Sequence, residues 1–227
     1  MFTLEHVVPW GRSFDEYRRM FALTGDDLRL GILGCGDGPA SFNAEATRRG
    51  TRVISCDPIY RYDAEQLRQR IAATSGEILE QTRKNAGEFV WTTITSVEEL
   101  GRVRLAAMND FLDDYAAGKR DGRYLDAELP TLPFADASFD LALSSHLLFL
   151  YTTQLGEAFH RAAILEMCRV AREVRIFPLL ALGAVPSPLV ERVADELRSQ
   201  RFVVSIEDVD YEFQRGGNQM MRIRPVS

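Results

Sequence analysis

Short apolar runs separated by helical patterns dominate the chain. Apolar runs at residues 30–33 and 53–57 are each followed by a helical pattern, and further short strands are predicted at 123–125 and 201–206. Short continuous apolar runs are typical of strands that are buried on both faces. Strands that alternate with helices indicate βαβ units and a parallel sheet. The pattern therefore predicts an α/β fold.

The hydrophobic pattern also predicts helices outside this alternation. Residues 11–24 read as a helix with a capping box formed by Ser13 and Glu16. Two more helical patterns fill residues 63–119, where a simple crossover needs a single helix. We expect one domain over residues 1–227, with a helical cap at 1–27 and a helical insertion at 61–121. The insertion either walls the active site or is a helical elaboration without substrate contact.

A glycine-rich turn follows the first predicted strand. Gly34, Gly36 and Gly38 alternate with other residues, and Asp57 ends the next strand 19 residues beyond Gly38. Glycines at a strand-to-helix turn let the backbone approach a ligand closely. A carboxylate at the end of the second strand is placed to accept hydrogen bonds from ribose hydroxyls. These residues predict a nucleoside-binding site.

The spacing of the turn separates two classes of ligand. A dinucleotide fingerprint needs its third glycine at position 39, which is Pro39. The alternating glycines instead resemble the G-x-G-x-G loop of class I S-adenosylmethionine-dependent methyltransferases. The resemblance extends over residues 28–60 and 122–224, and the stretches that carry it are 126–127, 132–134, 137–146 and 166–177.

This resemblance implies a fold and a set of site residues. The implied fold is a doubly wound, mostly parallel seven-stranded sheet of the Rossmann-like kind, with an antiparallel last strand. The implied cofactor is S-adenosylmethionine. The implied contacts are the methionine part with Gly34, Cys35 and Gly36, the ribose with Asp57, the adenine with Asp126 and Ala127, and the methyl centre with Ser144. Pro58 is a further implied cofactor-binding residue.

One position departs from the family. The family has an acidic residue two positions before the first glycine, where it helps to hold the methionine ammonium, and this chain has Ile32. Asp37 or another acid substitutes for it, or backbone carbonyls bind the ammonium, or cofactor binding is weak or lost. The sequence leaves these alternatives open.

A general base is needed only when the methyl acceptor must lose a proton. His146 follows the fourth strand of the resemblance and is the candidate base, and its alternative role is a hydrogen-bonded structural histidine. We expect His6 in a mobile N-terminus and His160 on a solvent-facing side of a helix. Asn43 is likewise expected at the surface. No residues have metal-ligand spacing or a nucleophile motif, so no metal is expected.

The amino-acid composition and net charge indicate which kinds of molecule the protein binds. The 227 residues are 46% hydrophobic and carry a formal net charge of −6, which argues against a broad phosphate-binding surface. There is no membrane-span pattern and no signal-peptide pattern, and three scattered cysteines do not form a disulfide framework. We expect a cytoplasmic protein with a small-molecule substrate and neither a nucleic-acid nor a membrane partner.

The sequence thus favours methyl transfer from S-adenosylmethionine to a small molecule. A non-catalytic domain that binds S-adenosylmethionine or a nucleoside is the first alternative, and Ile32 is the residue that favours it. A nicotinamide-dependent oxidoreductase is the second alternative, and Pro39 argues against it.

Overall fold

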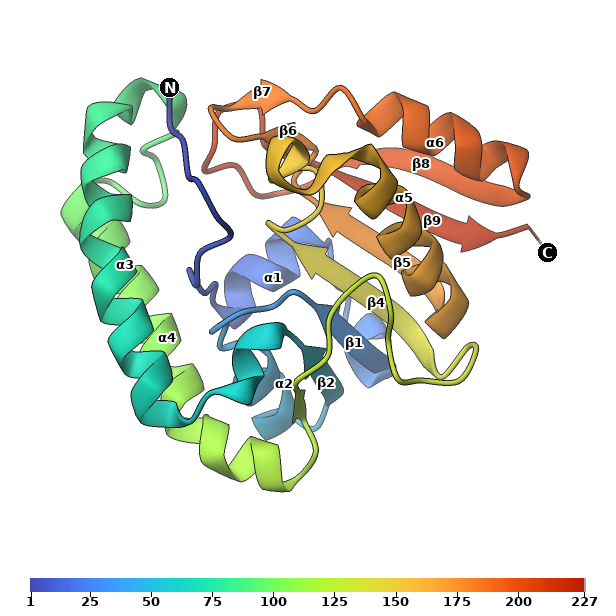
Figure 1. Cartoon of the computed structure of the whole chain (residues 1–227), viewed down its shortest axis with the longest axis horizontal. Coiled ribbons are helices and arrows are strands. Elements are labelled where there is room, and N and C mark those ends of the chain that lie inside the picture. Colours follow the sequence, from blue (N-terminus) through green and yellow to red (C-terminus); the bar gives the residue numbers. More distant parts are fainter. Residues whose placement is uncertain (227) are drawn as a thin grey trace.

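A seven-stranded sheet runs through the middle of the molecule in the computed structural model, which describes residues 1–226 (Figure 1). Neighbouring strands follow the order β3-β2-β1-β4-β5-β9-β8. Their bounds are β1 Gly31–Cys35, β2 Arg52–Cys56, β3 Tyr124–Leu125, β4 Phe139–Ser145, β5 Ala171–Phe177, β8 Phe202–Asp208 and β9 Gln219–Pro225. A separate two-stranded hairpin joins β6 (Leu180–Ala181) to β7 (Val185–Pro186).

The direction of the strands confirms the predicted fold class. The five strands β1 to β5 pair in parallel, whereas β9 is antiparallel to both β5 and β8. The sheet is therefore doubly wound and mostly parallel, and its last strand in sequence is antiparallel. The strand order reverses between β1 and β4, and open α/β sheets bind ligands beside the carboxyl ends of the strands at such a point.

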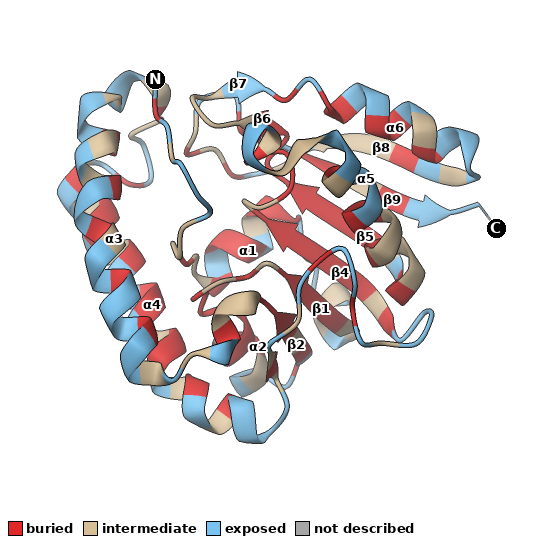
Figure 2. Ribbon diagram, in the orientation of Figure 1, coloured by how far each residue is buried: buried red, intermediate tan, exposed pale blue. Residues whose placement is uncertain are grey.

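Helices cover both faces of the sheet. Helices α1 (Phe14–Met20) and α2 (Phe42–Arg48) pack on one face, and α5 (Thr152–Val170) and α6 (Val190–Ser199) pack on the other. Buried positions are concentrated in the central strands, while the outward sides of the helices are exposed (Figure 2). The predicted capping box of Ser13 and Glu16 is present at the start of α1. Within residues 1–226, no helix has both the length and the apolar character needed to span a membrane.

Two long helices, α3 (Ala64–Lys84) and α4 (Val97–Arg120), occupy the chain between β2 and β3. They pack against each other and form one side of the molecule (Figure 1). The N-terminal segment, residues 1–10, runs between this pair and the ends of the central strands. The Phe2 amide donates to the Glu88 carboxylate (3.0 Å), and the Val8 amide donates to the Tyr151 hydroxyl (3.3 Å). The segment thus links the α3–α4 region to the chain that follows β4.

Two expectations about polar residues were wrong. Asn43 is buried rather than at the surface, because its amide nitrogen donates to the carbonyl oxygens of Val53 and Arg123 and so joins α2 to the sheet. His160 is fully buried rather than solvent-facing, because its side of α5 packs on the Phe149 ring. Its Nδ1 lies 2.6 Å from the Gly156 carbonyl oxygen, one turn earlier.

Candidate functional site

A cavity of about 320 Å³ opens at the carboxyl ends of the parallel strands. Gly36, which follows β1, Asp57, which follows β2, and His146, which follows β4, all line it. Volumes of about 300–1,000 Å³ are typical of sites for small ligands. The cavity therefore lies where the topology of the sheet predicts a ligand.

The structure brings together part of the predicted site. Four of the nine predicted residues line the cavity: Gly36, Asp57, Pro58 and His146. The others stand outside its wall: Gly34, Cys35 and Ser144 are buried in the strands, Ala127 is half-buried, and Asp126 is exposed and pairs with Arg61 (3.3 Å). Ser145, the neighbour of Ser144, lines the cavity, because alternate residues of a strand point to opposite faces.

The glycine turn is shaped around the carboxyl group of Asp37. A Cβ atom at Gly34 would lie 1.7 Å from Asp37 Oδ2, so a side chain at Gly34 would displace this carboxyl group. Gly36 has a positive φ of 70°, and a Cβ atom there would lie 2.4 Å from the Leu147 side chain. Both glycines are thus required where they stand. Gly34 lets the Asp37 carboxyl group fold back against β1 at the cavity wall, and Gly36 leaves room for the Leu147 side chain.

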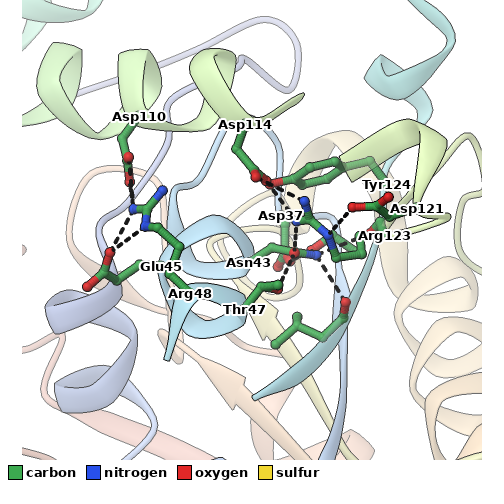
Figure 3. A network of polar contacts seen from close by, with 12 residues as sticks. Asp37, Asn43, Glu45, Thr47, Arg48, Asp110, Asp114, Asp121, Arg123 and Tyr124 are labelled. Carbon is green, nitrogen blue, oxygen red and sulfur yellow. Dashed lines mark hydrogen bonds and ion pairs between the residues drawn. The ribbon is translucent and has the colours of Figure 1, made fainter. Parts of the chain in front are cut away.

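Asp37 is the inner end of a buried polar network (Figure 3). Its carboxyl oxygens accept hydrogen bonds from the hydroxyls of Tyr17 (2.9 Å) and Ser55 (2.6 Å). Ser55 in turn accepts from the Asn43 amide (3.1 Å), and Asn43 accepts from the Arg123 guanidinium (2.9 Å). Burial raises the pKa of Asp37 to about 6, although both of its hydrogen bonds lower it. The carboxyl group is held in place and titrates close to neutral pH.

Asp57 joins the end of β2 to the glycine turn. Its Oδ2 accepts from the Gly38 amide (2.8 Å), and its Oδ1 accepts from the Ile59 amide (2.9 Å). Burial raises the pKa of Asp57 to about 6, while the two backbone hydrogen bonds lower it. An ionised carboxylate has about four acceptor positions, so about two remain for ligand hydroxyls.

His146 follows β4 and lines the same cavity. Its amide donates to the Phe177 carbonyl oxygen (2.7 Å), which ties it to the end of β5, and its Nδ1 lies 2.9 Å from Ser145 Oγ. Its φ of 57° is one that histidine adopts more readily than most residues. Burial, together with the charges of Arg12 and Arg104, holds the pKa of His146 well below 6.5. The imidazole is therefore neutral at neutral pH.

Several cavity residues were not predicted from the sequence. They are Arg12, Tyr17 and Glu128, together with apolar side chains of the N-terminal segment such as Phe2, Val8 and Trp10. The insertion contributes Ile78 and Thr82 from α3 and Leu100 from α4. The capping box predicted α1, but no local sequence pattern predicts that the residues before α1 line the cavity.

A search of known proteins finds a relative along almost the whole chain. The protein named "Uncharacterized protein MJ0045" from Methanocaldococcus jannaschii is 33% identical over 225 residues, which are 98% of this chain and 98% of that protein. The chain belongs to the family of this archaeal protein. No family model matches the chain.

Solved structures with similar folds are named as methyltransferases. Magnesium protoporphyrin IX methyltransferase from Synechocystis gives a TM-score of 0.46 at 11% identity, covering 93% of this chain and 90% of its own. The 1,6-didemethyltoxoflavin-N1-methyltransferase from Burkholderia thailandensis gives 0.44 at 13% identity, covering 87% and 72%.

Proposed function

We propose that the protein transfers a methyl group from S-adenosylmethionine to a small-molecule acceptor. The observation that carries this proposal is the single cavity that Gly36, Asp57 and His146 share at the ends of β1, β2 and β4. A glycine turn, an acid at the end of the second strand and a polar residue after the fourth are the features of the class I methyltransferase resemblance.

The residues on the β1–β3 side fit the proposed cofactor. Asp57 has acceptor positions left for two ribose hydroxyls, and Gly36 lines the cavity where the methionine part would lie. Asp37 supplies the negative charge that Ile32 lacks, because its carboxyl group is buried at the cavity wall beside β1. Gly34, Cys35 and Pro58 complete the proposed contacts.

The adenine contacts and the contact at the methyl centre are proposed from the resemblance. Asp126 and Ala127 are the proposed adenine contacts, and we add Leu129, which lines the cavity just beyond them. Ser144 remains the proposed residue near the methyl centre. Ser145 joins it because its side chain reaches the cavity wall.

The chain's own residues would orient the acceptor, exclude water and move a proton. When bound, the cofactor supplies an activated methyl group together with its leaving group. The N-terminal segment and the insertion cover the cavity with apolar side chains and so keep water away from the reacting atoms. With Nδ1–H donating to Ser145 Oγ, the neutral His146 leaves Nε2 to accept the proton of a hydroxyl acceptor.

A labelled methyl group tests this proposal against a non-catalytic binding domain. The protein is incubated with methyl-tritiated S-adenosylmethionine and a small-molecule extract of cells, and the label is followed by chromatography. We expect transfer by the wild type and a rate about 10²–10⁴ lower for His146→Asn, with unchanged affinity for S-adenosylhomocysteine. Asparagine tolerates the positive φ of this position. Binding of S-adenosylhomocysteine without any transfer would instead support the regulatory alternative.

A further inference from the structure

The cavity wall holds charged side chains of both signs. The carboxyl groups in its wall, those of Asp37, Asp57 and Glu128, follow β1, β2 and β3. Arg12 is the guanidinium in its wall among the described residues 1–226, and its charge acts on His146 and on Tyr151, both of which follow β4. Its charge also acts on Glu16 and on Tyr17, the residue whose hydroxyl donates to Asp37.

The guanidinium group of Arg12 makes few hydrogen bonds within the protein. Nη1 donates to the Trp10 carbonyl oxygen, whereas Nε is buried and has no hydrogen-bond partner. Within residues 1–226, no carboxylate lies within ion-pair distance of it. Burial and the charge of Arg104 lower the pKa of Arg12 to about 10, so it stays charged at neutral pH. The Nε–H group of this charged side chain therefore has no acceptor.

The nearby carboxylate of Glu16 is already occupied. It forms an ion pair with Arg104 and accepts hydrogen bonds from the Ser13 amide (2.9 Å) and the Tyr211 hydroxyl (2.8 Å). Burial alone would raise the pKa of Glu16, but the charge and hydrogen bond of Arg104 lower it to about 2. Glu16 is ion-paired with Arg104, and it acts on Arg12 only through its charge, which leaves one positive charge without an ion-pair partner among residues 1–226.

We propose, on the basis of the function proposed above, that Arg12 binds a carboxylate carried by an otherwise apolar methyl acceptor. A guanidinium can hold both oxygens of a carboxylate through two parallel hydrogen bonds. One negative charge balances this cluster, whereas a phosphate monoester would bring close to two. Much of the cavity wall is apolar and suits a hydrocarbon or aromatic body; its apolar residues include Val8, Leu150, Leu155, Phe159, Leu182 and Phe213.

Replacing the side chain of Arg12 leaves its backbone contact in place. The Ser41 amide donates to the Arg12 carbonyl oxygen (3.0 Å), so Arg12→Met keeps this link between the chain before α1 and the start of α2. Arg12→Lys keeps the charge but loses the planar fork. Arg18, an exposed arginine of α1, provides the matched control Arg18→Met.

The test compares 4-hydroxybenzoate with its neutral analogue 4-hydroxybenzamide. Each is titrated by calorimetry into the wild type and the three variants, with and without saturating S-adenosylhomocysteine. We expect the wild type and Arg18→Met to bind the acid at least tenfold more tightly than the amide. Arg12→Met should lose this preference, Arg12→Lys should keep part of it, and affinity for S-adenosylhomocysteine should change less than twofold.

Three results overturn the assignment. They are a wild type with no preference for the acid, an Arg12→Met variant that retains the preference, and a tenfold loss of S-adenosylhomocysteine affinity in Arg12→Met. The last result would assign Arg12 to the carboxylate of the cofactor. A wild type that does not bind S-adenosylhomocysteine contradicts the proposed function instead, and the preference for the acid is then judged from the cofactor-free titration.

Discussion

In the proposed function, Asp37 replaces the acid that class I methyltransferases carry at the position of Ile32. Ile32 is fully buried among apolar neighbours and offers no charge to an ammonium group. The carboxyl group of Asp37 reaches the cavity wall because Gly34 leaves space for it beside β1. Asp37 thus provides a carboxyl group five residues after Ile32, and the hydroxyls of Tyr17 and Ser55 hold it in place.

The pKa of Asp37 makes this substitution testable. Burial raises its pKa to about 6, so the carboxylate is ionised above pH 6 and protonated below it. Only the ionised form attracts an ammonium group. We therefore expect the affinity for S-adenosylhomocysteine to rise with pH by up to about tenfold per pH unit below pH 6, and to level off above pH 7.

Calorimetric titrations of the wild type and Asp37→Asn at pH 5, 6, 7 and 8 measure this dependence. The Asp37→Asn variant should bind more weakly at pH 7 and depend less on pH. A shallow dependence should remain, because the pKa of Asp57 is also about 6. Parallel pH curves for the two proteins would show that Asp37 does not meet the ammonium group.

At the scale of elements, α1 and α4 are joined by a buried ion pair. Arg104 of α4 is fully buried, and its partner Glu16 in α1 is nearly so. Tyr211, from the chain between β8 and β9, donates to the same carboxylate (2.8 Å). The insertion is therefore attached to the sheet domain by charge as well as by apolar contacts.

Removing the carboxylate from this group should be strongly destabilising. Glu16→Gln leaves the charge of Arg104 buried without its partner, which typically costs about 3–5 kcal/mol. The measurement is the free energy of unfolding in urea, compared with Asp15→Asn at the adjacent exposed position. A loss of less than about 1 kcal/mol in Glu16→Gln would mean that packing alone holds α4 in place.

The chain between α3 and α4 should respond to ligand. Phe89 lies in this connection and lines the cavity together with Thr82 and Leu100. We expect S-adenosylhomocysteine to slow cleavage by trypsin and chymotrypsin within residues 84–96, while cleavage at the exposed turn near Arg120 keeps its rate. Equal rates in residues 84–96 with and without ligand would support the helical elaboration without ligand contact.

At the scale of the whole molecule, the sequence predicted the sheet better than the cavity. The apolar runs around Ile32 and Val53 are strands because both faces of the sheet are covered, and the capping box at Ser13 starts a helix by local hydrogen bonding. Apolar runs and capping boxes can be read from the sequence because they involve residues that are close together in the chain. The positions of Asn43 and Arg12 depend on segments far away in the chain, so no local pattern could predict them.

A calorimetric titration of the whole protein with S-adenosylhomocysteine and, separately, with NAD tests directly whether the cavity is an S-adenosylmethionine site. We expect one molecule of S-adenosylhomocysteine to bind per chain and NAD to give no measurable heat. Asp57→Asn should weaken the binding about tenfold or more, since a hydrogen bond to a charged group contributes about 1.5–3 kcal/mol. The control Asp113→Asn, at an exposed position of α4, should bind like the wild type. A wild type that binds NAD but not S-adenosylhomocysteine, or an Asp57→Asn variant with unchanged affinity, would contradict the proposed cofactor site.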